Sequence, residues 1–150
     1  MIDQLQAESA KPGVFAVAEG STLAADDSHR GGYPTSHAAT WCAATAIGHL
    51  HAIKMLVVDA GVHHLLATST LARGTIEAAA TGLWMLSPPD KATRDERCIR
   101  WWCQNANDQH KAKPDEARRD EVLSQVTHGV PHANRIRKGY YMTDVVDWVD

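Results

Sequence analysis

Between Asp59 and Asp90 the chain carries only two charged side chains, Arg73 and Glu77, and they are four residues apart. Leu, Ala, Thr and Gly make up most of this stretch, so it predicts a helix that is buried in the core. Burying an ion costs several kcal/mol unless it is paired. We therefore expect Arg73 and Glu77 to be buried together, and to mark either a functional site or a fixed packing of helices.

The composition of the 150-residue chain predicts an all-α protein. Alanine is abundant and there is a single Phe, and such sequence favours helix over sheet. The length fits one domain with one core. We expect an antiparallel helical bundle of about four helices over residues 34–150. An irregular N-terminal arm, interrupted by Gly and Pro, is expected over residues 1–33.

Helical periodicity predicts four main helices, over about residues 36–59, 63–87, 93–112 and 114–128. Thr35 or Ser36 would cap the first helix, and a capping box from Thr93 to Glu96 would open the third. Within the third helix, Ile99, Trp102, Cys103 and Ala106 form the stripe that should face inward. A loop is expected over 132–141 and a short helix after Thr143.

A polar stripe follows the second predicted helix at helical spacing. Its members, joined by a histidine from the facing helix, are the candidate ligand-binding residues Thr70, Arg73, Glu77, Thr81, His49 and His51. Arg73 would hold an anionic or carbonyl group, and Glu77 would orient that group or act as a base. The alternative is a purely structural bundle, in which Arg73 and Glu77 only set the register of the helices.

Small residues recur at every fourth position of the same helix, at Gly74, Ala78 and Gly82. Such a row lets a neighbouring helix approach closely. Together with the aromatic third helix, it predicts that the protein is a homo-oligomer. The polar stripe predicts a further partner, which would be a small molecule or another protein.

No cofactor and no metal site is expected. The nine His residues form no HExxH or Glu-x-x-His pair, and the three Cys residues show no CxxC spacing. An odd number of Cys and a start unlike a signal peptide predict reduced thiols and a cytoplasmic protein. Arg73 and Glu77 lie near the centre of residues 60–86, which argues against a membrane span there.

Nucleic acid is a weaker candidate partner. The net charge of −3 gives no general affinity for it. The basic run 135–138, followed by Tyr140 and Tyr141, could contact phosphate and stack a base, but such runs are more often solvated loops.

Several segments carry a resemblance to known proteins, namely residues 34–37, 49–52, 71–77, 83–88 and 95–100. They resemble a large group of uncharacterised actinobacterial helical proteins, most specifically in a helix with Arg-xxx-Glu followed by Trp-x-Leu-x-Pro. The resemblance covers about residues 34–110 and implies an all-α domain. It also implies a distant similarity to HEPN-like bundles, some of which act in toxin or phage-defence systems.

The HEPN-like similarity implies an alternative function, a metal-independent ribonuclease. Nucleases of that type carry an Arg closely followed by a His, and Arg30 and His37 match this pattern. The pair Gly31-Gly32 and Pro34 lie between them and interrupt any helix. Arg30, His37 and Glu77 are therefore the weak candidates for catalytic residues.

Overall fold

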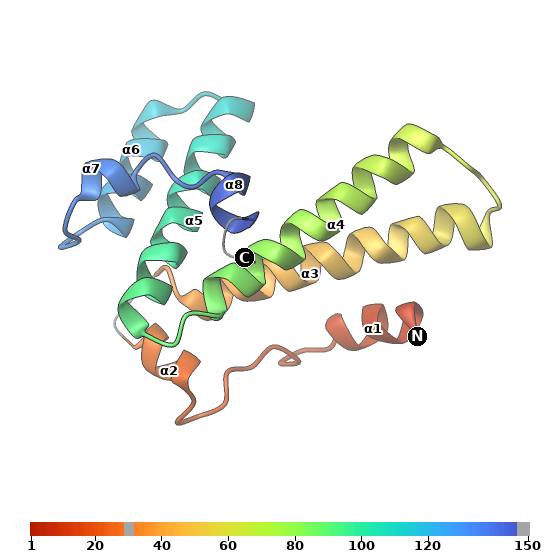
Figure 1. Ribbon diagram of the computed structural model, residues 1–150, viewed down its shortest axis with the longest axis horizontal. Coiled ribbons are helices and arrows are strands. Elements are labelled where there is room, and N and C mark those ends of the chain that lie inside the picture. Colours follow the sequence, from red (N-terminus) through yellow and green to blue (C-terminus); the bar gives the residue numbers. More distant parts are fainter. Residues whose placement is uncertain (29–31, 147–150) are drawn as a thin grey trace.

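The computed structural model describes residues 1–28 and 32–146, and every regular element in these ranges is helical (Figure 1). The predicted all-α class is confirmed. The elements are α1 (Ile2–Ser9), α2 (Thr22–Asp27), α3 (Thr35–Lys54), the π-helical turn η1 (Met55–Asp59), α4 (Leu65–Leu86), α5 (Lys91–Ala112), α6 (Glu116–Val126), α7 (Ala133–Ile136) and α8 (Met142–Val146). Figure 1 shows α3, η1 and α4 as a long antiparallel hairpin that projects from a body formed by α5 to α8.

The N-terminal arm is helical in two places, so it is not irregular throughout as expected. α1 lies beside the hairpin, where the Asp3 carboxylate is 2.9 Å from Lys54 Nζ and 3.4 Å from His51 Nε2. α2 starts at Ser21, whose side chain accepts a hydrogen bond from the Ala24 N–H. The boundary drawn at residue 33 stays a prediction.

The helix starts show where local capping signals mislead. α3 begins at Thr35, and Pro34 takes the N-cap position that was predicted for Thr35 or Ser36. The first turn is capped from outside the helix, because the Ser36 N–H donates to Asp27 Oδ1 at 3.0 Å. α5 begins before the predicted capping box, because Asp90 caps it by accepting from the Thr93 N–H at 2.8 Å. The two prolines before Asp90 end α4 and leave the next residue free to start a helix.

Two buried clusters form the core, and α5 contributes to both. The first cluster joins α3, α4, α5 and α8 and contains Ala38, Cys42, Trp84, Met85, Cys98, Trp101 and Val145. The second joins α5, α6 and α7 and contains Ile99, Cys103, Ala106, Leu123, Val126 and Ile136. The predicted inward stripe of α5 is confirmed at Ile99, Cys103 and Ala106, while Trp102 is half-buried between the clusters.

The middle of the chain is not the core, so this expectation is wrong. No residue from 47 to 80 is buried, and α4 buries only Thr81, Trp84 and Met85. Arg73 and Glu77 form an ion pair of 2.6 Å, but their side chains are 78% and 36% exposed. An apolar stretch predicts that another part of the protein packs over it. Among the described residues, only α1 packs along the outer part of the hairpin, so most of the stretch remains accessible to solvent.

A buried ion pair does exist, between Asp26 of α2 and Arg94 of α5. Arg94 donates to both Asp26 carboxylate oxygens, at 2.7 and 3.0 Å, and the two side chains are 1% and 8% exposed. The second Arg94 terminal nitrogen donates to the carbonyls of Pro88 and Pro89. Lys91 adds a longer contact to Asp26. The pair thus fastens α2 to the corner between α4 and α5.

Candidate ligand-binding cleft

A cleft of about 520 Å³ lies where α3, α4 and α5 meet the segment that leads into α8. We call it the aromatic cleft. Its lining consists of Trp41, Cys42, Thr45 and His49 of α3, Gly74, Glu77, Ala78 and Thr81 of α4, Trp101, Gln104 and Asp108 of α5, and Tyr140, Tyr141 and Met142.

Small residues of α4 shape one wall of the aromatic cleft. A Cβ atom on Gly74 would lie 2.6 Å from the Nδ1 and Cε1 atoms of His49, and one on Gly82 would lie 3.2 Å from Cys42 Cβ. These glycines therefore let α3 of the same chain approach α4. The row that includes Ala78 was expected to receive a neighbouring subunit, and it gives no support to self-association.

The structure brings three of the predicted ligand-binding residues together and leaves three outside. Glu77, Thr81 and His49 line the aromatic cleft. Thr70, Arg73 and His51 are outside its lining. Thr70 donates to the Leu66 carbonyl, Arg73 extends into solvent, and His51 faces Asp3 of α1. The predicted stripe thus splits because its members lie on more than one face of the hairpin.

Among the described residues, the aromatic cleft is lined by two carboxylates, Glu77 and Asp108, and by no Lys or Arg. Each carboxylate has a cationic partner outside the lining, Arg73 at 2.6 Å from Glu77 and Lys111 at 2.8 Å from Asp108. Partial burial raises the pKa of Asp108, but hydrogen bonds from Lys111 and Gln104 outweigh this and hold the pKa below its ordinary value. Asp108 therefore stays ionised near neutral pH. Arg73 donates to one oxygen of Glu77 from outside the cleft and leaves the other oxygen without a side-chain donor among the described residues.

Two of the deeper groups of the cleft, a thiol and a phenol, are kept uncharged by burial. Burial raises the pKa of the Cys42 thiol to about 11, so this thiol stays protonated near neutral pH. Burial likewise raises the pKa of the Tyr140 phenol, whose ring lies 5.2 Å from that of Trp84. The buried His49 Nδ1 has no hydrogen-bond partner among the described residues. These groups offer an apolar floor with a few polar atoms.

Sequence reasoning missed most of the cleft's aromatic and α5 residues. Trp41 and Tyr141 are 55% and 72% exposed at its rim, while Gln104 and Asp108 come from a face of α5 that reads as solvated surface. Tyr140 and Tyr141 were singled out only as stacking residues of a loop. No local sequence pattern indicates that the segment before α8 packs against α3 and α4.

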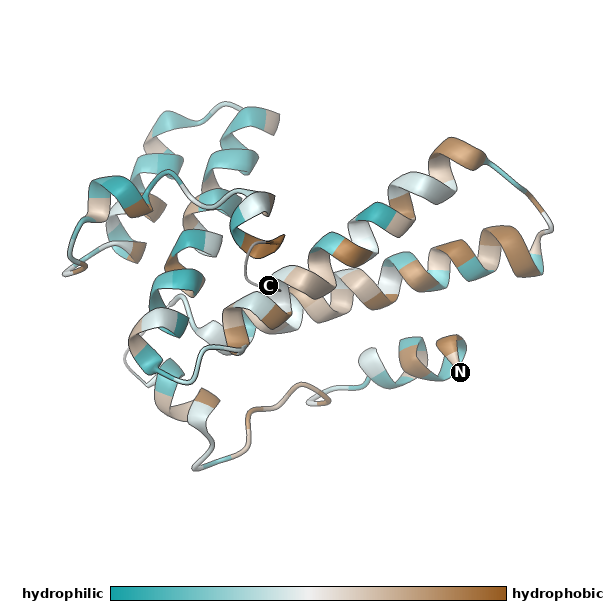
Figure 2. Ribbon diagram, in the orientation of Figure 1, coloured by the Kyte–Doolittle hydropathy of each residue, from teal (hydrophilic) through white to brown (hydrophobic). Residues whose placement is uncertain are grey.

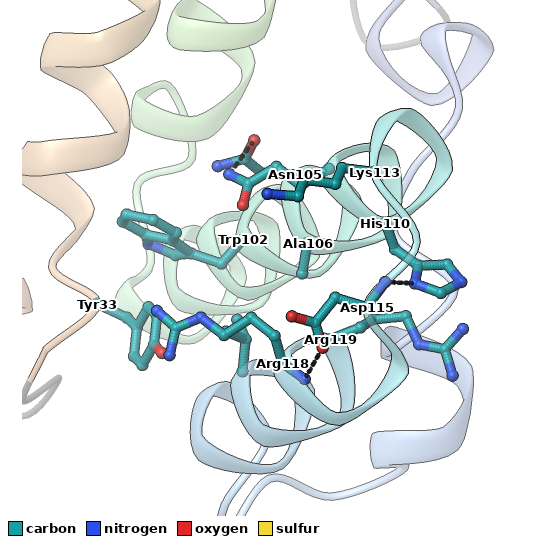
Figure 3. A pocket seen from close by; sticks show the side chains of 11 residues that line it. Tyr33, Trp102, Asn105, Ala106, His110, Lys113, Asp115, Arg118 and Arg119 are labelled. Carbon is teal, nitrogen blue, oxygen red and sulfur yellow. Dashed lines mark hydrogen bonds between the residues drawn. The ribbon is translucent and has the colours of Figure 1, made fainter.

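A second, smaller pocket of about 290 Å³ lies between α5 and α6 and contains none of the predicted ligand-binding residues (Figure 3). Trp102 and Tyr33 form one end, with ring centroids 5.2 Å apart. At the other end, His110 Nδ1 accepts from the Asp115 N–H, and the Asp115 carboxylate caps α6. Arg118 and Arg119 line it as well, and each pairs with an acid of its own helix.

The ribonuclease candidates are not assembled by the part of the chain that the structure describes. Arg30 lies outside the described residues. The His37 ring is exposed and packs at 5.6 Å from Trp102 and 6.1 Å from Trp41. Within residues 1–28 and 32–146, no three His, Cys, Asp or Glu side chains gather as a metal site would require. The nuclease function therefore stays a prediction.

Comparisons with protein-family models, with curated proteins and with solved structures returned no match. The resemblance to actinobacterial and HEPN-like helical proteins therefore stays a prediction.

Proposed function

We propose that this protein binds a small organic cation with an apolar or aromatic part in the aromatic cleft. The observation that carries the proposal is the sign of the charge: two carboxylates line the cleft and no cation does. A cationic ligand would give Glu77 a second partner and would gain from the field of Asp108. The purely structural bundle is the alternative.

The aromatic side chains support the same class of ligand. Trp41, Trp101, Tyr140 and Tyr141 surround the opening and floor of the cleft. The face of an aromatic ring attracts a cation within about 6 Å of its centroid, most strongly for Trp. The volume of about 520 Å³ falls in the range of small-molecule sites. An aromatic, acidic cleft of this size favours an amine or a quaternary ammonium over an anion.

The first test compares three probes that share a phenyl ring: benzyltrimethylammonium, benzyl alcohol and benzoate. We expect isothermal titration calorimetry to show the tightest binding for the cation and the weakest for benzoate, because carboxylates repel benzoate. Equal affinity for all three probes would mean that the cleft binds the phenyl ring without selecting for charge, which would contradict the proposal. Tighter binding of benzoate would overturn the proposal.

Two substitutions then distinguish the contribution of Glu77 to ligand binding from that of Arg73. Glu77→Gln is expected to weaken binding of benzyltrimethylammonium about tenfold, the equivalent of one charge-assisted contact. Arg73→Gln is expected to strengthen it, because it removes the guanidinium that hydrogen-bonds the Glu77 carboxylate. Glu121→Gln, an exposed acid of α6, is the matched control and should change nothing. If Arg73→Gln weakens binding instead, the guanidinium belongs to the site and the ligand is not a cation.

A further inference from the structure

The outer part of the hairpin exposes large apolar side chains to a degree unusual for a folded domain. Val58, Leu65, Leu66, Ile76 and Leu83 are between 62% and 83% exposed. Figure 2 shows this apolar material along α3, η1 and α4, whereas α5 and α6 are mostly hydrophilic. The sequence of this stretch resembles that of a buried helix, but the described residues do not bury it.

A regular row of small and apolar residues, most of them exposed, runs along α4. Positions 65, 69, 72, 76, 79, 83 and 86 follow one another at alternate steps of four and three residues, which is the spacing of a coiled-coil seam. We call this row the outer seam. It contains Leu, Ile, Ala and Ser and no charged residue. It lies on the face of α4 opposite Gly74 and Thr81, which pack toward α3 and the aromatic cleft.

We propose that the outer seam packs against the outer seam of a second copy of this chain, with the two α4 helices antiparallel. A two-fold axis midway between Ile76 and Ala79 places Ile76 opposite Ala79 of the second copy. It also places Leu83 opposite Ala72, and Leu86 opposite Ser69. Each of these three large side chains then faces a small one, so the part of the seam from Ser69 to Leu86 is complementary to itself, as a symmetric dimer interface must be. Leu65 lies beyond the paired part.

The charges next to the seam are compatible with this pairing. Arg73 flanks the seam, and the proposed axis places it opposite Gly82 of the second copy. The two copies of Arg73 are then about 14 Å apart along the helices, which exceeds the screening length at physiological salt. The Arg73–Glu77 ion pair remains at the edge of the interface, where water still reaches it.

The paired area is that of a weak dimer. Ile76, Leu83 and Leu86 are 69%, 62% and 41% exposed and face small residues across the seam. Together with those small residues they would bury roughly 400 Å² per copy, at the low end of specific interfaces, where association is weak and depends on concentration. The aromatic cleft lies on the other face of α4 and stays open, so dimer formation and ligand binding are separable.

A bilayer is the competing occupant, because Thr35–Asp59 is long and apolar enough to span one, with a mean hydropathy of 1.4. α4 would have to enter the bilayer beside it, carrying Arg73 and Glu77 at mid-length. Ionised side chains at that depth are costly. The pairing of large with small residues across the outer seam serves helix packing and has no purpose against lipid chains.

The test is sedimentation equilibrium of the full chain over a broad concentration range. We expect the wild-type protein to reach the mass of two chains. Ile76→Glu and Leu83→Glu should weaken association at least tenfold, since each introduces charge into the seam on both copies. Leu5→Glu on α1 replaces another exposed leucine and should leave association unchanged. Because Ile76 and Leu83 are exposed, circular dichroism should show the helical content of the wild type in all variants.

Cysteine cross-linking tests the direction of the pairing. The native cysteines Cys42, Cys98 and Cys103 are all buried, so they should not interfere. The antiparallel arrangement predicts an intermolecular disulfide in the double variant Ala72→Cys with Leu83→Cys, and none in Ala72→Cys alone. Cross-linking of Ala72→Cys alone would indicate parallel helices and overturn the proposed geometry.

Two further outcomes would overturn the proposal itself. One is a single-chain mass at every concentration. The other is binding of the wild type to phosphatidylcholine–phosphatidylglycerol vesicles that Ile76→Glu abolishes, because this would assign the outer seam to a membrane surface.

Discussion

Asp26→Asn is expected to lower the free energy of unfolding by about 3–5 kcal/mol, the range found when one partner of a buried ion pair is removed. The substitution keeps the size of the side chain but leaves the Arg94 guanidinium buried without a counterion. Arg94 cannot escape by losing its proton, because the pKa of a guanidinium lies far above neutral pH even without a carboxylate partner. Urea unfolding followed by circular dichroism measures the effect.

The double variant Asp26→Leu with Arg94→Met provides the control. It removes both charges and is expected to recover most of the lost stability, since apolar replacements of buried pairs are often neutral. Recovery should be incomplete because the Pro88 and Pro89 carbonyls lose their donor. If Asp26→Asn costs less than about 1 kcal/mol, then α2 detaches and lets water reach Arg94, and the pair does not hold the fold together.

The same pair predicts a dependence on pH. Hydrogen bonds from Arg94 hold the pKa of Asp26 below its ordinary value of 3.8, against the opposing effect of burial. The Asp26 contribution to stability is therefore complete above that value and is lost as the pH falls through the lowered pKa. We expect the stability difference between wild type and Asp26→Asn to be constant near neutral pH and to shrink in acid. A difference that grows in acid would contradict this assignment.

Gly74→Ala is expected to destabilise the protein by about 1–3 kcal/mol, the typical cost of overpacking. The added methyl would meet the His49 ring at 2.6 Å, so the ring or the whole of α4 must move. His49 lines the aromatic cleft, and its displacement should also alter the affinity for benzyltrimethylammonium. Thermal unfolding and calorimetry measure the two effects.

Gly48→Ala is the matched control for this prediction. Gly48 lies in α3 with no atom within 4 Å of an added Cβ. In a helix interior, alanine is favoured over glycine by about 0.5–1 kcal/mol, so this substitution should stabilise the protein. Adding His49→Ala to Gly74→Ala should relieve the clash. If Gly74→Ala raises the melting temperature as Gly48→Ala does, the close packing of His49 on α4 is wrong.

Local pattern was sufficient to predict the four long helices, α3 to α6, and the inner face of α5, but it missed the short helices α1, α2 and α7. Charged residues cover most of α5, so the apolar stripe at Ile99, Cys103 and Ala106 leaves one choice of inward face. α4 offers no such choice. It has a row of small residues through Gly74 and a row of larger ones through Ile76, on opposite faces, and few charges on either. A sequence with two apolar faces predicts a helix. It does not predict which of the two faces packs against the rest of the same chain.

The candidate site was predictable only in part, for a similar reason. Glu77 and Thr81 share a face of one helix, so their spacing predicted that they act together. Asp108 and Tyr140 reach the same cleft from α5 and from the segment before α8. No short-range pattern links positions that far apart in the sequence. Arg73 was assigned to the site because it is four residues from Glu77, yet the helix directs its side chain into solvent.

The sequence by itself determined that the chain is helical, which faces of its charged helices turn inward, and that the stretch around Arg73 is apolar enough to need cover. Only the tertiary structure decided which charges are buried. Arg73 and Glu77 are neighbours on one helix and are exposed, whereas Asp26 and Arg94, separated by 68 residues, are enclosed where α2 meets the start of α5. Burial depends on what packs over a side chain, and that partner comes from a distant part of the chain.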